Sequence, residues 1–164
     1  MDTPYLERLY NLARELNIAD NIKTILDTIT DHLPKVLEAR YCSLFVKNPA
    51  SGGLELKAHN HKDIGQDPFI NITSEQESIM NLALARNSSL LIRDIEEEIG
   101  IANKEKYSTK SFMSILITHD NEIKGVLNLA DKGPDGFNKD DMLVVSTIAE
   151  LLGALLNRID LSKI

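Results

Sequence analysis

Two histidines near the middle of the chain have the spacing that best suits metal binding. His59 and His61 flank Asn60, and Asp63 follows, so imidazole and carboxylate groups lie close together in the sequence. On a strand, residues 59 and 61 would project from the same side, and imidazole is the commonest metal ligand. A metal site needs a third and usually a fourth ligand, and the sequence identifies neither. We therefore expect no metal site and interpret this segment as a solvated loop.

Cys42 is the only cysteine in the chain, so no internal disulfide can form. It lies in the run YCSLFVK, which is rich in aromatic and β-branched residues. No neighbouring motif would activate its thiolate, so we expect a buried structural thiol. Chemistry that needs a cysteine pair is excluded, and no nucleophile-elbow or P-loop signature occurs.

Charge and composition exclude several classes of partner. Eighteen basic residues against 25 acidic ones give a formal charge of −7, which repels nucleic-acid phosphates and anionic lipid. No apolar run approaches the ~20 residues needed to cross a bilayer, and the start MDTPYLERLY does not resemble a signal peptide. We expect a cytoplasmic protein without a nucleic-acid partner or membrane insertion, and the sequence requires no cofactor.

Helices are predicted at both ends of the chain. Apolar residues recur at helical spacing in residues 1–18 and again from Ile22 to Leu33, where Pro34 should kink or break the second helix. The last helix is predicted over residues 138–160. Its start is well marked, because Asn138 can cap it and Asp141 occupies the N3 position.

The segments between these helices predict a layered α+β domain. Alternation and β-branched content indicate two hairpins and an isolated strand, with a helix in the middle of the chain. The strands are 41–47 with 54–59, then 90–92, and then the runs SFMSILITHD and IKGVLNLAD, and the helix is 74–86. In SILI and GVLNLA both alternating sets are apolar, which indicates helices on both faces of the sheet.

The last helix carries two apolar stripes. One is a heptad seam that includes Val145, Leu152, Leu156 and Ile159, and the other runs from Val144 to Leu155. One stripe can cover the sheet of its own domain, and the other then needs a partner. We expect the same helix of a second copy, joined by the N-terminal helix, in a homodimer. The alternative is that the N-terminal helix of the same chain covers both stripes.

The order of elements and four strings within it resemble the GAF family over nearly the whole chain. The strings are ARYCSLFVKNPASGGLELKAH, NSSLLIRDI, YSTKSFMSILI with IKGVLNLADK, and FNKDDMLVVSTIAELLGALLNR. The resemblance implies a single GAF domain over residues 1–164. Its fold would be similar to that of PAS domains: a central antiparallel sheet, terminal helices on one face, and short helices and loops over a small-molecule pocket on the other.

The resemblance also implies a function. GAF domains generally act as sensors that bias an attached output domain in signalling proteins. We expect a regulatory module of a bacterial signalling protein that binds a small molecule, with cyclic nucleotides among the candidates, and signals through its terminal helices in a dimer. The alternative is a ligand-free dimerisation or protein-interaction module. The output domain could be attached or separate.

The family fold places particular residues at the pocket. By resemblance, the strand face that carries Ser43 and Phe45 looks toward it, as does the face with Asn128, where cyclic-nucleotide-binding relatives often have an acid. The remaining candidates come from the middle helix and the following loop: Ser78, Ile79, Tyr107, Thr109 and Ser111. These side chains would combine an apolar lining with a few polar groups.

Part of a motif from cyclic-nucleotide-binding GAF domains is present. Lys132, Phe137 and Asp141 match it, whereas Asp131 and Met142 replace its Asn and its final Glu. We interpret Lys132 and Asp141 as a structural ion pair between the last strand and the last helix.

The enzymatic and photoreceptor branches of the family fit the sequence less well. Free methionine sulfoxide reductases resemble this fold but depend on several cysteines, and bilin attachment requires a cysteine context that is missing here. We therefore expect a chain that is not an enzyme.

Overall fold

The computed structural model describes residues 2–61, 79–103 and 107–159. Two helices open the chain, three strands of the sheet follow with two short helices among them, and a long hairpin leads into the last helix. In chain order the elements are α1 (Thr3–Ile18), α2 (Ile22–Leu37), β1 (Ala39–Lys47), β2 (Leu54–His59), α3 (Ile79–Arg86), β3 (Leu90–Ile92), α4 (Ile95–Glu98), β4 (Phe112–His119), β5 (Glu122–Lys132) and α5 (Lys139–Arg158).

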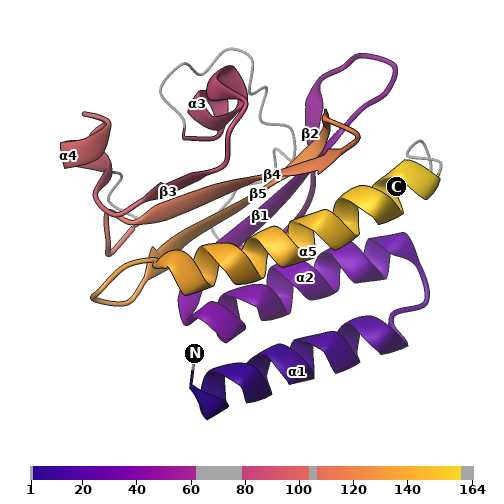
Figure 1. Cartoon of the computed structure of the whole chain (residues 1–164), viewed down its shortest axis with the longest axis horizontal. Coiled ribbons are helices and arrows are strands. Elements are labelled where there is room, and N and C mark those ends of the chain that lie inside the picture. Colours follow the sequence, from indigo (N-terminus) through magenta and orange to yellow (C-terminus); the bar gives the residue numbers. More distant parts are fainter. Residues whose placement is uncertain (1, 62–78, 104–106, 160–164) are drawn as a thin grey trace.

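The strands form one antiparallel sheet in the order β2-β1-β5-β4-β3. Helices α2 and α5 lie side by side over one face, with α1 packed against α2, whereas α3 and α4 lie on the opposite side (Figure 1). The fold class predicted from the sequence, an α+β sheet with the terminal helices on one face, is confirmed. We call the face that carries α3 and α4 the site face.

The main core lies between the sheet and the three long helices. Alternate strand residues such as Leu44, Ile115 and Leu127 meet Leu33 and Leu152 there, and all five are nearly inaccessible to solvent. Two smaller apolar clusters occupy the site face. Helices therefore cover both alternating sets of strand residues, as the apolar runs of β4 and β5 predict.

Helix α2 does not break at Pro34. It continues through this proline to Leu37, and Val36 and Leu37 are both buried in the main core. Proline removes one backbone donor close to the end of the helix, and burial of the last apolar turn outweighs that loss. The helix ends at Glu38, whose backbone is left-handed with a φ of 58°.

The heptad seam predicted for dimerisation is buried in the main core of its own domain, which corrects that expectation. Val145, Leu152 and Leu156 are 0%, 3% and 1% exposed, and Ile159 packs against the same cluster. These side chains cover the sheet of their own domain, so they are not available to a second copy. The large apolar residues that α5 leaves exposed are Leu143 and Leu151.

Candidate functional site

A row of polar side chains crosses the middle of the site face. Ser43 of β1 pairs with His59 of β2 and with Asn128 of β5, and Asn128 pairs in turn with Ser114 of β4. Directly paired residues of antiparallel strands project to the same face. We call His59, Ser43, Asn128 and Ser114 the polar row. Ser43 and Asn128 were both predicted at the pocket, and the structure brings them together.

Asn128 is the centre of this row. Its side-chain Oδ1 accepts a hydrogen bond of 2.7 Å from the Ser114 hydroxyl, and its Nδ2 donates to the Met80 sulfur of α3 at 3.2 Å. Met80 is buried, so α3 rests directly on the row. The sequence analysis missed Ser114 and Met80. Ser114 could have been found, because it is a hydroxyl residue that alternates with the apolar residues Phe112 and Leu116.

Apolar side chains surround the row on both sides. One cluster contains Phe45, Leu56, Met80 and Val126. The other contains Tyr41, Ile92, Phe112 and Ala130, with Ile79 and Tyr107 packed against it. The predicted pocket residues Phe45, Ile79 and Tyr107 therefore belong to the apolar surroundings of the row. Ser78 lies outside the described residues.

Aromatic rings extend the second cluster toward the end of β2. Tyr41 stacks on His61 with centroids 4.6 Å apart, and Tyr107 meets both Tyr41 and Phe112 edge to face. The His59 Nδ1 accepts the backbone N–H of His61 at 3.2 Å. His61 is only 9% exposed, so the interpretation of this residue as part of a solvated loop is wrong. In the described part of the chain, no group of three His, Cys, Asp or Glu side chains could hold a metal ion.

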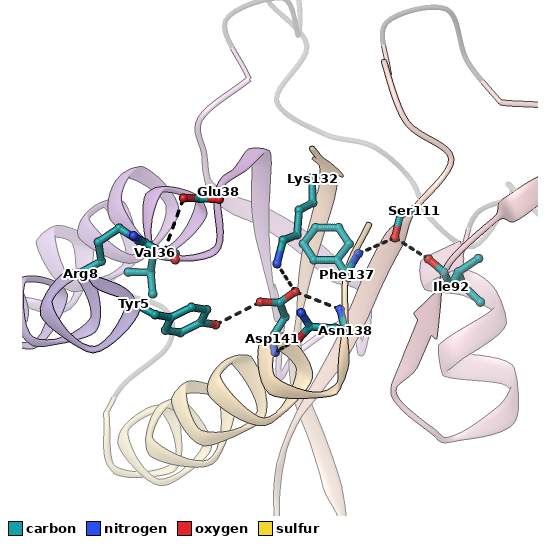
Figure 2. A network of polar contacts seen from close by, with 10 residues as sticks. All are labelled: Tyr5, Arg8, Val36, Glu38, Ile92, Ser111, Lys132, Phe137, Asn138 and Asp141. Atoms are coloured by element: carbon teal, nitrogen blue, oxygen red, sulfur yellow. Dashed lines mark hydrogen bonds and ion pairs between the residues drawn. The ribbon is translucent and has the colours of Figure 1, made fainter. Parts of the chain in front are cut away.

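Ser111 does not face the row, contrary to the prediction. It is 1% exposed, its hydroxyl donates to the Ile92 carbonyl at 2.9 Å, and its Oγ accepts the Phe137 N–H at 2.9 Å (Figure 2). Both hydrogen bonds are internal, so this serine joins β3, β4 and the loop before α5. A Cβ on Gly136 would lie 2.8 Å from the same Oγ, so the loop packs tightly here.

Thr109 belongs to the loop that leads to β4. Its backbone N–H donates to Asp131 at 2.8 Å, and its buried Oγ1 has no hydrogen-bond partner among the described residues. Asn103, whose Nδ2 donates to the Thr109 carbonyl, has an equally unpartnered Oδ1.

The predicted ion pair between Lys132 and Asp141 is present. Asp141 is fully buried, and its Oδ2 lies 2.5 Å from the Lys132 ammonium and 3.0 Å from the Asn138 N–H. Together with the bond from the Asp141 N–H to Asn138, this completes a capping box. The Tyr5 hydroxyl donates to the other oxygen at 3.1 Å, so one carboxylate joins α1, β5 and α5 (Figure 2). Burial, together with the charge of Asp141, raises the pKa of Tyr5.

Cys42 lies on the opposite face of β1 from Ser43, in the main core, and is 0% exposed. Burial raises the pKa of its thiol far above the usual range. The interpretation of Cys42 as a buried structural thiol is confirmed. Among the described residues, no helix combines the length and the apolar character that a membrane span requires.

Solved structures with this fold include GAF domains from larger proteins. The GAF domain of an Acinetobacter phosphoenolpyruvate-protein phosphotransferase is 17% identical, with 96% of this chain and 95% of that chain covered and a TM-score of 0.73. The corresponding domain from Coxiella burnetii is 22% identical, with coverages of 92% and 90% and a TM-score of 0.71. At these identities the likeness concerns the fold. No curated protein sequence matches the chain.

Enzymes share the fold as well, which corrects the expectation that the chain is not an enzyme. The free methionine-R-sulfoxide reductase of Neisseria meningitidis, solved with its substrate, is 15% identical, with coverages of 93% and 88% and a TM-score of 0.73. This reductase is as similar in fold to this chain as the GAF domains of the two phosphotransferases are, so the architecture does not separate enzymes from those domains.

The sequence relationship is more specific than the structural likeness. The family model described as GAF domain matches residues 21–156, which include every strand, the polar row and nearly all of α5. This chain belongs to the GAF domain family.

Proposed function

We propose that this chain is a regulatory sensor module that binds a small molecule over the polar row and transmits binding through its terminal helices. The observation that carries this proposal is the row itself. Polar side chains inside an apolar surface are costly unless they hydrogen-bond, and strand residues at this position could all have been apolar. An apolar lining with a few convergent polar groups is typical of small-molecule sites.

The relatives support a small ligand on this fold. A reductase with the same architecture has been solved with its substrate, and other similar structures are domains of larger proteins. By analogy, an output domain, attached or separate, would receive the signal of this module in a bacterial cytoplasm. A ligand must bind one state better than another to bias such an output.

Native mass spectrometry of the purified chain, with a thermal-shift screen of cyclic nucleotides and small metabolites, tests the binding proposal. We expect a co-purified mass or a shift that follows mass action. Asn128→Ala should abolish that response. Ser114→Ala is the matched control, because it removes the same internal hydrogen bond and leaves the Asn128 N–H groups in place. Equal loss of response in both variants, together with equal loss of folding, would favour a packing role for the row.

A homodimer through the outer surfaces of α1 and α5 is the second part of the proposal. Five large apolar side chains are 51–74% exposed there: Leu6, Tyr10, Ile18, Leu143 and Leu151. Burial of such side chains is worth about 1.5–3 kcal/mol each, and a second copy is a partner with the same surface. These residues replace the buried seam as the proposed contact.

Light scattering tests the dimer. The wild type should have the mass of two chains, and Leu143→Glu with Leu151→Glu should halve it without unfolding the protein. Asn157→Glu, an exposed polar position on the same helix, is the control and should remain dimeric. A monomeric wild type at high concentration would refute this part and leave the binding proposal intact.

A ligand-free dimerisation module is the alternative. The contact between Met80 and Asn128 favours this alternative, because the Asn128 nitrogen at the centre of the row already donates a hydrogen bond to the Met80 sulfur. This alternative predicts an empty dimer with no responder in the thermal-shift screen.

A further inference from the structure

The orientation of the Asn128 amide follows from its two neighbours. Oxygen and nitrogen of an amide are assigned from the hydrogen-bond network. The Ser114 hydroxyl could bond to either atom, but the Met80 sulfur can only accept. The amide nitrogen must therefore face Met80, because an amide oxygen in that position would place two acceptors, the oxygen and the sulfur, next to each other without a hydrogen between them. Asn128 thus presents N–H donors to the space between the sheet and α3.

Two further donors follow Asn128 on the β1 side of the row. The Ser43 hydroxyl makes no hydrogen bond to the described residues, although the side chain is only 9% exposed. The His59 Nδ1 accepts from His61, so in the neutral imidazole Nε2 carries the proton. His59, Ser43 and Asn128 are consecutive across three strands. The row therefore presents hydrogen-bond donors to the site face, and the acceptor that meets the Asn128 nitrogen is the weakly accepting sulfur of Met80.

The buried side chains of the two clusters around the row carry no charge, and Arg40, whose guanidinium lies over the Tyr41 ring, is paired with Asp131. Members of these clusters on the strands are Tyr41, Phe45, Phe112, Val126 and Ala130. Asp131 is engaged by Arg40 and by the Thr109 N–H at the end of β5. A phosphate or carboxylate over the row would lose its hydration without gaining a cation from the sheet, and a buried unpaired charge is costly.

We infer that the polar row recognises a neutral hydrogen-bond acceptor, such as the carbonyl oxygen of a small, largely apolar molecule, which replaces the Met80 sulfur on the Asn128 amide. This ligand class rests on the proposed function, since it concerns the same site. A carbonyl oxygen accepts more strongly than a thioether, and the rest of such a ligand would pack on the apolar clusters. Because Met80 belongs to α3, a ligand of this kind would displace that helix from the row.

Four probes of similar size test the inference: acetophenone, benzoate, benzylammonium and toluene. Each is titrated into the ¹⁵N-labelled full chain, and the Asn128 side-chain amide resonance, identified by its loss in Asn128→Asp, is followed by NMR. We expect acetophenone to shift this resonance and to bind about tenfold more tightly than the other three. Asn128→Asp should reverse the preference toward benzylammonium, because a carboxylate accepts where the amide donated.

A milder variant keeps the test valid if Asn128→Asp does not fold. Ser43→Ala should weaken acetophenone about threefold with an unchanged melting temperature, whereas Ser88→Ala, an exposed serine before β3, should have no effect. Tightest binding of benzoate or benzylammonium at the row would overturn the inference and leave the proposed function standing. If no probe shifts any resonance of the row, the inference is overturned, and the thermal-shift screen decides the proposed function separately.

Discussion

Replacing Asp141 with asparagine tests whether one buried carboxylate holds the terminal helices to the sheet. Asp141 is 0% exposed and accepts from Lys132, Tyr5 and the Asn138 N–H. Asparagine has nearly the same size and can still accept at one oxygen. The substitution therefore removes the charge, at least one hydrogen bond, and the counter-ion of Lys132, while the backbone of the cap can stay in place.

The expected loss of stability is about 3 kcal/mol. Removing one partner of a buried ion pair typically costs about 3–5 kcal/mol, because the other charge is left uncompensated. The Lys132 side chain is 16% exposed, so water can hydrate its ammonium in part, and we take the lower end. For a domain of this length, that loss corresponds to a fall of about 6–12 °C in the melting temperature.

Urea denaturation followed by circular dichroism measures this loss. A double-mutant cycle with Lys132→Met separates the energy of the ion pair from the other effects of each substitution. The double variant should be at least ~1 kcal/mol more stable than the sum of the two single effects predicts. Lys139→Met, an exposed lysine in the first turn of α5, is the control and should change stability by less than ~0.5 kcal/mol. A cost below ~1 kcal/mol for Asp141→Asn, or strictly additive effects, would refute the reasoning.

Two further predictions concern packing and the buried thiol. Gly153→Ala should destabilise the protein by about 1–3 kcal/mol, because the added Cβ would lie 2.1 Å from the Thr118 carbonyl oxygen. Gly133→Ala is the control: its Cβ would meet open space, so the variant should be nearly neutral in the same urea titration. Iodoacetamide should alkylate Cys42 at pH 8 only after unfolding, since burial raises the pKa of the thiol, and rapid modification of the native protein would contradict this. In the folded protein the Cys42 thiol stays protonated at a pH at which the thiol of the unfolded chain ionises. The unfolding free energy should therefore decline as the pH rises above 9.0, the ordinary pKa of the thiol. The decline should be less steep in Cys42→Ala.

The sequence predicted the strands of the sheet and the start of α5 well, because those signals are local. Alternation places Ser43 and Cys42 on opposite faces of β1, and this holds for any sheet that contains this strand. The family resemblance placed Asn128 on the face of Ser43, and the pairing of β1 with β5 confirms it. The cap of α5 is equally local, since Asn138 and Asp141 satisfy each other within one turn. The direction of the site face, by contrast, came from the family resemblance and not from alternation itself.

The errors of the sequence analysis concern which elements of the fold pack against each other. The stripe of Val145, Leu152 and Leu156 is apolar as predicted, but its spacing fits a second copy of α5 and the sheet of the same chain equally well. Ser111 was placed at the pocket by its position in a loop, and two internal hydrogen bonds decide otherwise. Met80 could not be assigned to the row from the sequence, because the packing of α3 on β5 is a contact between segments that are distant in the sequence.

Strand β5 connects the polar row to the terminal helices. Asn128 and Ala130 project to the site face, and strict alternation would place Lys132 there too. Asp131 has a φ of 68°, a left-handed conformation that Asp and Asn adopt more readily than most residues. This turns the strand so that Lys132 reaches Asp141 at the start of α5, and through it Tyr5 of α1. Because only three residues lie between Asn128 and Lys132 on one strand, we expect a displacement of β5 at the row to move the anchor of both terminal helices as well.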